Sequence, residues 1–255
     1  MGILRILKST FFISTIKRIY KSVLLFDNKS QSRVSFEERF LNLSFSQEGE
    51  DLVLERMLGE KLNGFYVDIG AHHPLRFSNT YKFYLKGWTG INIDPLPGMK
   101  ELFDKYRGND INLNIGISNT GNLLNYYMFN EPALNTFSEQ QAIIRDGLNN
   151  GEYFLTKQLK IETYRLVDVL DKYCHNKNID FMTIDVEGFD FEVLTSNNWD
   201  KYSPKYLILE ILNETIVNII NSDIDLYLNN KGYLLVSKLV NSVVYKRSKD
   251  LDEFQ

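Results

Sequence analysis

One stretch decides the fold of this chain: Gly64-Phe65-Tyr66-Val67-Asp68-Ile69-Gly70-Ala71-His72-His73-Pro74. Its apolar first half predicts a buried strand over Phe65–Ile69, and the acid, glycine and polar loop that follow predict a sharp turn. A second apolar run, Gly90–Ile93, also ends in an acid, Asp94. Parallel strands bring their carboxyl ends to one edge of an open α/β sheet, where ligands bind. The two acids, Asp68 and Asp94, therefore indicate a nucleoside site at that edge.

A third predicted strand, Phe181–Ile184, is followed by Asp185, with Glu187 and Gly188 close behind. Carboxylates that crowd together raise one another's pKa, so this pair could supply a general base near neutral pH. Two structural alternatives stay open. Glu187 could cap a helix beside Gly188, and Asp94 could belong to an ordinary turn.

The glycine content of the first loop argues against a dinucleotide. A pyrophosphate is usually seated by Gly-x-Gly-x-x-Gly at a helix N-terminus, but this loop has Gly70 alone before Pro74. A sulfonium cation with an amino-acid tail needs no such cradle. Asp68 would then lie near the ammonium group of that tail, and Asp94 would accept the ribose hydroxyls.

The remaining pattern predicts a sheet of alternating strands and helices that ends in a hairpin. Helices are expected from Ser46, after Ser78 or Asn79, and over Met99–Tyr106, Leu166–Tyr173, Gly188–Ser196 and Ile224–Asn230, with further strands over Ile111–Ile117, Gln158–Thr163 and Tyr206–Leu212. Tyr233–Leu239 and Val243–Lys246 are joined too briefly for a parallel crossover, so they must be antiparallel. A sheet of βα units that ends in an antiparallel hairpin resembles the class I methyltransferases. The resemblance implies an α/β, Rossmann-like class I methyltransferase fold with a mostly parallel seven-stranded sheet and an antiparallel C-terminal hairpin.

Between these elements the sequence predicts an insertion. Asn119-Thr120-Gly121-Asn122 reads as a turn before Leu123–Phe129, which indicates a hairpin-like segment. Residues 130–157 are less regular and could cap the site. By position alone, Asn135, Thr136 and Arg145 could contact an acceptor.

Composition bounds the class of protein. With 255 residues, 44% of them hydrophobic and 24% charged, the chain suits one large globular domain. A net charge of −4 disfavours a nucleic-acid partner. The single cysteine, Cys174, excludes an intrachain disulfide and fits a reducing cytoplasm.

The N-terminal region differs from the rest. Residues 1–29 carry a net charge of +5, which leaves −9 for the remainder, and their basic residues interrupt every long apolar run. We predict a basic amphipathic helix and linker over residues 1–44, followed by a catalytic domain over 45–255. Residues 1–26 could make peripheral contact with the inner face of a membrane, or pack on the domain itself or on a second subunit.

Short motifs follow one another in a fixed order: Ser46-Gln47-Glu48-Gly49-Glu50-Asp51, Val67-Asp68-Ile69-Gly70-Ala71, Ser78-Asn79-Thr80, Gly87-Trp88, Ile93-Asp94-Pro95, Ile179-Asp180-Phe181 and Asp185-Val186-Glu187-Gly188. Together they resemble the FkbM family of S-adenosylmethionine (SAM)-dependent methyltransferases over residues 45–212. The resemblance implies SAM as cofactor and O-methylation, often of a sugar hydroxyl in surface glycans or natural products. The chain departs from many members at His72-His73-Pro74, where they have an asparagine and a second glycine.

From the motifs and the resemblance we predict roles for a small set of residues. Cofactor contacts are expected from Asp68, Gly70, Ala71, Asp94 and Asp185; catalytic roles from Asp185, Glu187 and His73; and acceptor contacts from His72, Asn79 and Glu50. No metal is expected, because neighbouring histidines point in different directions and no His-x-x-His spacing occurs. A divalent ion held by Asp185, Glu187 and a histidine remains an alternative.

Two other functions stay open at this stage. One is a nicotinamide-dependent oxidoreductase or epimerase of nucleotide sugars, which the missing glycines disfavour. The other is a non-catalytic module of a glycan-assembly complex. The acceptor is a small molecule or a glycan, and no residue in the sequence selects a particular sugar.

Overall fold

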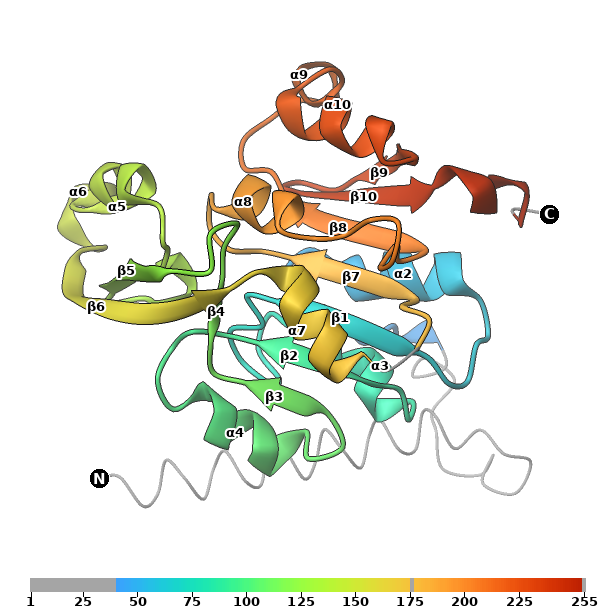
Figure 1. Cartoon of the computed structure of the whole chain (residues 1–255), viewed down its shortest axis with the longest axis horizontal. Coiled ribbons are helices and arrows are strands. Elements are labelled where there is room, and N and C mark those ends of the chain that lie inside the picture. The colour runs from blue at the N-terminus through green and yellow to red at the C-terminus, as the bar shows by residue number, and fades with distance from the viewer. Residues whose placement is uncertain (1–39, 175–176, 254–255) are drawn as a thin grey trace. The chain divides into compact units, whose positions relative to one another are not determined.

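The computed structural model describes residues 40–174 and 177–253, and from Phe45 onward the chain forms one compact unit (Figure 1). The predicted N-terminal helix and its membrane contact lie outside the described residues. Within the described ranges, no helix combines the length and apolarity that crossing a bilayer would require.

A seven-stranded sheet lies at the centre of this unit, in the order β3-β2-β1-β7-β8-β10-β9. Its strands are β1 Phe65–Ile69, β2 Thr89–Ile93, β3 Ile111–Leu113, β7 Phe181–Ile184, β8 Tyr206–Glu210, β9 Tyr233–Lys238 and β10 Ser242–Arg247. The first five are parallel, and β10 pairs antiparallel with both β8 and β9. The predicted α/β fold, with its C-terminal antiparallel hairpin, is confirmed.

The strand order reverses between β1 and β7, because the chain moves outward from β1 to β3 and then returns to the other side of β1. Ligands of open α/β sheets bind in the crevice at such a reversal, beyond the carboxyl ends of the strands. The fold therefore places the ends of β1 and β7 at the position where a ligand is expected.

Helices cover both faces of the sheet, which explains why all five residues of β1 are buried (Figure 1). Outside the insertion between β3 and α7, the helices are α2 Glu50–Leu58, α3 Tyr81–Leu85, α4 Met99–Tyr106, α7 Leu166–Tyr173, α8 Asp190–Thr195, α9 Ile216–Ile219, α10 Asp223–Asn230 and the 3₁₀ helix η3 Ser248–Glu253. Val67 and Ile69 pack in the core with α7 and α8, whereas Tyr66 packs with α2 and α3. The alternation of side chains along a strand thus divides the core into two layers.

The insertion between β3 and α7 builds a second, three-stranded sheet. Its strands are β4 Gly116–Ile117, β5 Leu123–Phe129 and β6 Leu155–Tyr164, in the order β4-β6-β5. The residues between β5 and β6 form the 3₁₀ helix η2 Pro132–Leu134 and the helices α5 Glu139–Arg145 and α6 Leu148–Gly151. Residues 130–157, which we expected to be less regular, thus contain three short helices.

Two expectations about the insertion were wrong. The predicted strand Ile111–Ile117 is two strands in different sheets, and Asn114 at the break donates to the carbonyl oxygens of Asp94 and Leu96. The turn at 119–122 does not close a hairpin, because β4 and β5 both pair with β6 instead of with each other. Apolar alternation continues across a change of sheet, so it does not reveal the change.

Two helix starts also differ from expectation. α2 begins at Glu50 instead of Ser46, because Gly49 has a left-handed φ of 88° and the Ser46 hydroxyl bonds the Asp51 carboxyl. α3 begins at Tyr81, after Phe77, whose φ is 54°.

Candidate active site

A cavity of about 890 Å³, counted with its open mouth, lies at the carboxyl ends of β1, β2 and β7. The sheet contributes Asp68, Gly70, Ala71, His72, Ile93, Asp94, Asp185, Val186 and Glu187 to its wall, and the insertion contributes Tyr126, Pro132, Ala133, Asn135, Thr136 and Phe137. The two sheets of the molecule therefore share one cavity. Four acids line it, and the described lining residues include no lysine or arginine.

Gly70 allows the turn after β1 to approach β7 closely. Its φ is 80°, and a Cβ built on it would lie 1.7 Å from the carbonyl oxygen of Asp185. The amides of Gly70 and Ala71 both donate to the carbonyl of Ile93, at 3.0 and 3.1 Å. The turn is thus fixed between β2 and β7, and a side chain at position 70 would separate them.

Asp94 ties the end of β2 to the first loop. Its Oδ2 accepts from the amide of His72 and its Oδ1 from the amide of Leu96, each at 2.8 Å. Burial raises the pKa of Asp94 to about 7, although these two hydrogen bonds lower it. Each carboxylate oxygen keeps a second acceptor site, so a turn role and a ribose-binding role are compatible.

Asp68 lies deeper in the wall, at 5% exposure. Its Oδ2 accepts from the Thr80 hydroxyl at 2.7 Å, and burial raises its pKa to about 6. Asp68 and Asp94 thus form one acidic side of the cavity.

Three acids gather at the ends of β7 and β8. One carboxylate oxygen each of Asp185, Glu187 and Glu210 lies within 4.8 Å of the others. Burial, Glu210 and Glu187 raise the pKa of Asp185 well above its usual range, and Oδ1 of Asp185 is buried without a partner in the described part of the chain. Burial and Glu187 also raise the pKa of Glu210, to about 8. These oxygens could share protons or hold a divalent cation.

Glu187 differs from the other two acids because a cation holds it. Nη2 of Arg145 donates to it at 2.5 Å, and the Thr136 hydroxyl donates to its backbone carbonyl at 2.9 Å. Its φ of 58° is unusual for a residue other than glycine. Burial raises the pKa of Glu187, and Arg145 acts against that shift.

Two residues of the insertion that we expected to contact the acceptor, Arg145 and Asn135, have different surroundings. Arg145 is 4% exposed and also donates to the carbonyl of Leu134, so its guanidinium is used inside the protein. Asn135 lines the cavity, and its Nδ2 is buried without a partner among the described residues. Burial raises the pKa of the Tyr126 hydroxyl, the nearby Asn135 side chain acts to lower it, and both residues face the space where a ligand would bind.

The two histidines lie in different environments. His72 lines the cavity, stacks on Phe77 and has a buried Nε2 without a partner in the described ranges. Burial and the nearby Arg76 lower its pKa, which favours a neutral ring. His73 does not line the cavity. Its Nδ1 accepts the amides of Leu75 and Arg76, and its pKa falls to about 4.

Two predicted acceptor residues lie beside the acid cluster. Asn79 lines the main cavity, and its Nδ2 donates to the Thr183 hydroxyl at 3.0 Å. Glu50 lines a smaller adjoining cavity together with Asp185 and Glu210. Its carboxylate accepts from the Ser242 hydroxyl at 2.7 Å, which links α2 to β10.

Glu210 was missed by sequence reasoning, although a signal existed. It ends β8 in the same way that Asp94 follows β2 and Asp185 follows β7. The predicted strand, Tyr206–Leu212, extends two residues beyond the observed end at Glu210. The prediction therefore placed Glu210 inside the strand and not at its carboxyl end.

Comparison with known proteins adds a family match. The family model described as Methyltransferase FkbM domain matches residues 68–235. No curated protein matches the sequence significantly. Among solved structures, one described as a putative RNA methyltransferase from Pyrococcus horikoshii has 11% identity and a TM-score of 0.39, over 85% of this chain and 94% of that one.

Proposed function

Because this chain belongs to the FkbM family of SAM-dependent methyltransferases, we propose that it methylates a sugar hydroxyl during synthesis of a surface glycan or natural product. The observation that carries the proposal is that one cavity contains both the acids suited to SAM and a separate acid cluster suited to a hydroxyl. The predicted cytoplasmic location fits such a role. The use of SAM replaces the nicotinamide alternative.

The cavity fits a cationic nucleoside. Its acids, together with the absence of lysine and arginine from its described lining, would attract a sulfonium and repel a phosphate. Asp94 would accept the ribose hydroxyls, Asp68 would face the ammonium group, and the turn at Gly70 would let the ligand approach the backbone. When bound, SAM supplies a methyl group on a positively charged sulfur.

The acid cluster can remove a proton from the acceptor. Asp185 faces the cavity with an unpartnered Oδ1, and Glu210 stands beside it. Two nearby carboxylates hold a proton more tightly than one, so the pair can accept a hydroxyl proton near neutral pH. Glu187, which Arg145 orients and whose pKa Arg145 lowers against the effect of burial, would hold the acceptor hydroxyl in line.

The insertion supplies the acceptor side. Tyr126, Pro132 and Phe137 give this wall an apolar surface that excludes water, and Asn135 and His72 offer a donor and an acceptor without partners in the described chain. The same acidic lining favours an uncharged sugar over a sugar diphosphate.

Calorimetry on the full chain tests the cofactor site. We expect SAM to bind, and Asp94→Asn to weaken binding by about tenfold or more, because an amide accepts fewer hydroxyl protons. Asp104→Asn, at a side chain that is 46% exposed on α4, is the matched control and should leave the affinity unchanged. Wild-type protein that fails to bind SAM would rule the proposal out.

Methyl transfer to a panel of neutral glycans tests the reaction itself. Asp185→Asn should abolish turnover while SAM still binds. Intact binding with no product from any acceptor would instead favour the non-catalytic module.

A further inference from the structure

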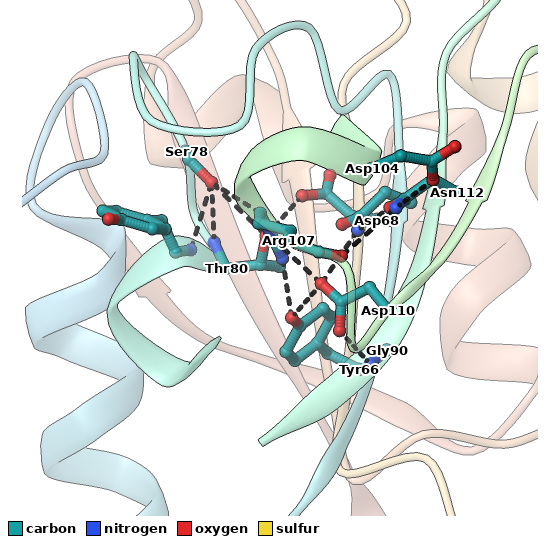
Figure 2. A network of polar contacts seen from close by, with 11 residues as sticks. Tyr66, Asp68, Ser78, Thr80, Gly90, Asp104, Arg107, Asp110 and Asn112 are labelled. Carbon is teal, nitrogen blue, oxygen red and sulfur yellow. Dashed lines mark hydrogen bonds and ion pairs between the residues drawn. The ribbon is translucent and has the colours of Figure 1, made fainter. Parts of the chain in front are cut away.

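A buried polar network lies behind Asp68, and Figure 2 shows how its members converge. At its centre is Arg107, directly after α4, whose side chain is 0% exposed. Nε of Arg107 donates to Asp110 at 2.9 Å, and Nη2 donates to the Tyr66 hydroxyl at 2.6 Å. The third nitrogen of the guanidinium, Nη1, contacts Thr80, which lies between Arg107 and Asp68 in the cavity wall.

Thr80 links this guanidinium to Asp68. Nη1 of Arg107 donates to Oγ1 of Thr80 at 2.9 Å, and Oγ1 donates to Oδ2 of Asp68 at 2.7 Å. No hydrogen bond reaches Oδ1 of Asp68 from the described residues, and Asp68 lines the cavity. The second oxygen is therefore left for a ligand.

The direction of the hydrogen bonds follows from the chemistry of the groups. A guanidinium can only donate, so the Thr80 oxygen must accept from it. The single hydroxyl proton of Thr80 then goes to Asp68, whose Oδ2 is 2.7 Å away and negatively charged, and not to the Ser78 hydroxyl at 3.3 Å. A carboxylate that accepts such a proton is favoured in its ionised form.

The side chain of Thr80 does not cap the helix that follows it. It occupies the N-cap of α3, yet its hydroxyl makes no capping bond. Ser78 accepts the amide of Tyr81 instead, at 3.1 Å. An N-cap side chain reaches the next amides from an extended backbone, whereas Thr80 has φ −113° and ψ −18°. Its hydroxyl therefore points to Asp68 and Arg107 and not to the start of α3.

We propose that Thr80, supported by Arg107, is a positioning residue that keeps Asp68 ionised and aligned for the ammonium group of SAM. This inference rests on the proposed function. Among the charged groups around Asp68, Arg107 favours ionisation, whereas Asp110 behind it and Asp94 and Asp185 across the cavity oppose it. Burial also raises the pKa of Asp68, and the contacts with Thr80 and Arg107 lower it.

A pair of ligands separates this role from a structural one. S-Adenosylhomocysteine carries the amino-acid tail, and 5′-methylthioadenosine is the same nucleoside without it. Thr80→Val preserves the side-chain shape and removes the hydroxyl. Losing a hydrogen bond to a charged group should raise the pKa of Asp68 by about one unit, from about 6 to about 7. We therefore expect Thr80→Val to weaken S-adenosylhomocysteine by about eightfold at pH 5.5 and by only about twofold at pH 7, and to leave methylthioadenosine within about twofold at both.

The pH profile gives a second readout. The affinity for S-adenosylhomocysteine should fall at low pH, as Asp68 becomes protonated. The pH at the midpoint of that fall should be about one unit higher in Thr80→Val than in the wild type, within the range from about pH 6 to pH 8. Thr80→Ser, which restores the hydroxyl, should return the midpoint to the wild-type value. Tyr66→Phe is the matched control: it removes a buried hydroxyl bonded to the same guanidinium and leaves the Thr80–Asp68 bond intact.

The outcomes are distinct. If Thr80→Val weakens both ligands equally, or if Tyr66→Phe shifts the midpoint as much as Thr80→Val, the network is only structural and the inference is wrong. If neither ligand binds the wild-type protein, the proposed function fails instead.

Discussion

At the scale of single residues, Gly70 is the clearest constraint. We expect Gly70→Ala to destabilise the fold by about 3 kcal/mol or more, because it adds left-handed strain to a clash with rigid backbone. Gly98→Ala separates the two effects, since Gly98 has a φ of 87° and nothing lies within 4 Å of its added Cβ. Urea unfolding should show a loss of only about 1 kcal/mol for that control. If both variants lose the same free energy of unfolding, the contact with Asp185 does not contribute to the effect at position 70.

Some of the site residues could be predicted from the sequence, and others could not. Asp68, Asp94 and Asp185 could be placed near one another because each follows a parallel strand, and the fold brings such ends together. Thr80 and Arg107 could not be predicted, because a hydrogen-bonded chain through a buried arginine has no sequence spacing of its own. The chemistry of imidazole suggests a catalytic role for His73, but its Nδ1 accepts two loop amides, and that role stays a prediction.

At the scale of elements, an ion pair of Arg145 on α5 with Glu187 after β7 joins the insertion to the central sheet. A second pair, Arg76 with Glu131, lies nearer the surface. Arg145→Lys should lower kcat by about tenfold or more and leave SAM affinity within about twofold, because lysine lacks the forked geometry that orients a carboxylate. Steady-state kinetics with calorimetry checks this split.

Arg165→Lys is the control for that experiment. Arg165 pairs with Asp168 on the surface, where both side chains are about half exposed, and such pairs contribute little. A matching loss of SAM affinity in Arg145→Lys would show that α5 supports cofactor binding instead of acceptor geometry.

Element boundaries were predictable where one pattern governed them. The bounds predicted for β1, α4, α7 and β7 match the structure, since each is a short apolar or amphipathic run between clear turn signals. The pairing of β5 with β6 was not predictable, because 25 residues separate Phe129 from Leu155 and strand partners so distant leave no local pattern.

At the scale of the whole molecule, the cavity should make stability depend on pH. Burial raises the pKa to about 6 for Asp68, about 7 for Asp94 and Asp190, and about 8 for Glu210. The folded state therefore binds more protons than the unfolded state between about pH 4 and pH 8, so stability falls as pH rises through this window. We expect the melting temperature to fall from about pH 5 to about pH 8.

Ligand binding should reverse part of that loss. A cationic nucleoside would favour the ionised forms of Asp68 and Asp94, the two of these acids that line the main cavity, so the stabilisation by saturating SAM should be larger at pH 8 than at pH 6. Thermal scans with and without ligand, at constant ionic strength, measure the difference. Stability that rises with pH would contradict the assignment of raised pKa values to these acids.

The insertion has a consequence for how such enzymes diversify. Residues 116–164 run continuously along the chain and supply the wall of Asn135, Thr136 and Phe137, whereas the wall of Asp68 and Asp94 comes from separate strands of the central sheet. Evolution could therefore exchange one uninterrupted segment, and with it the proposed acceptor side, without rebuilding the wall proposed to hold the methyl donor. A chimera that receives this segment from a relative of different acceptor preference should inherit that preference, and the graft would have to carry a partner for Glu187.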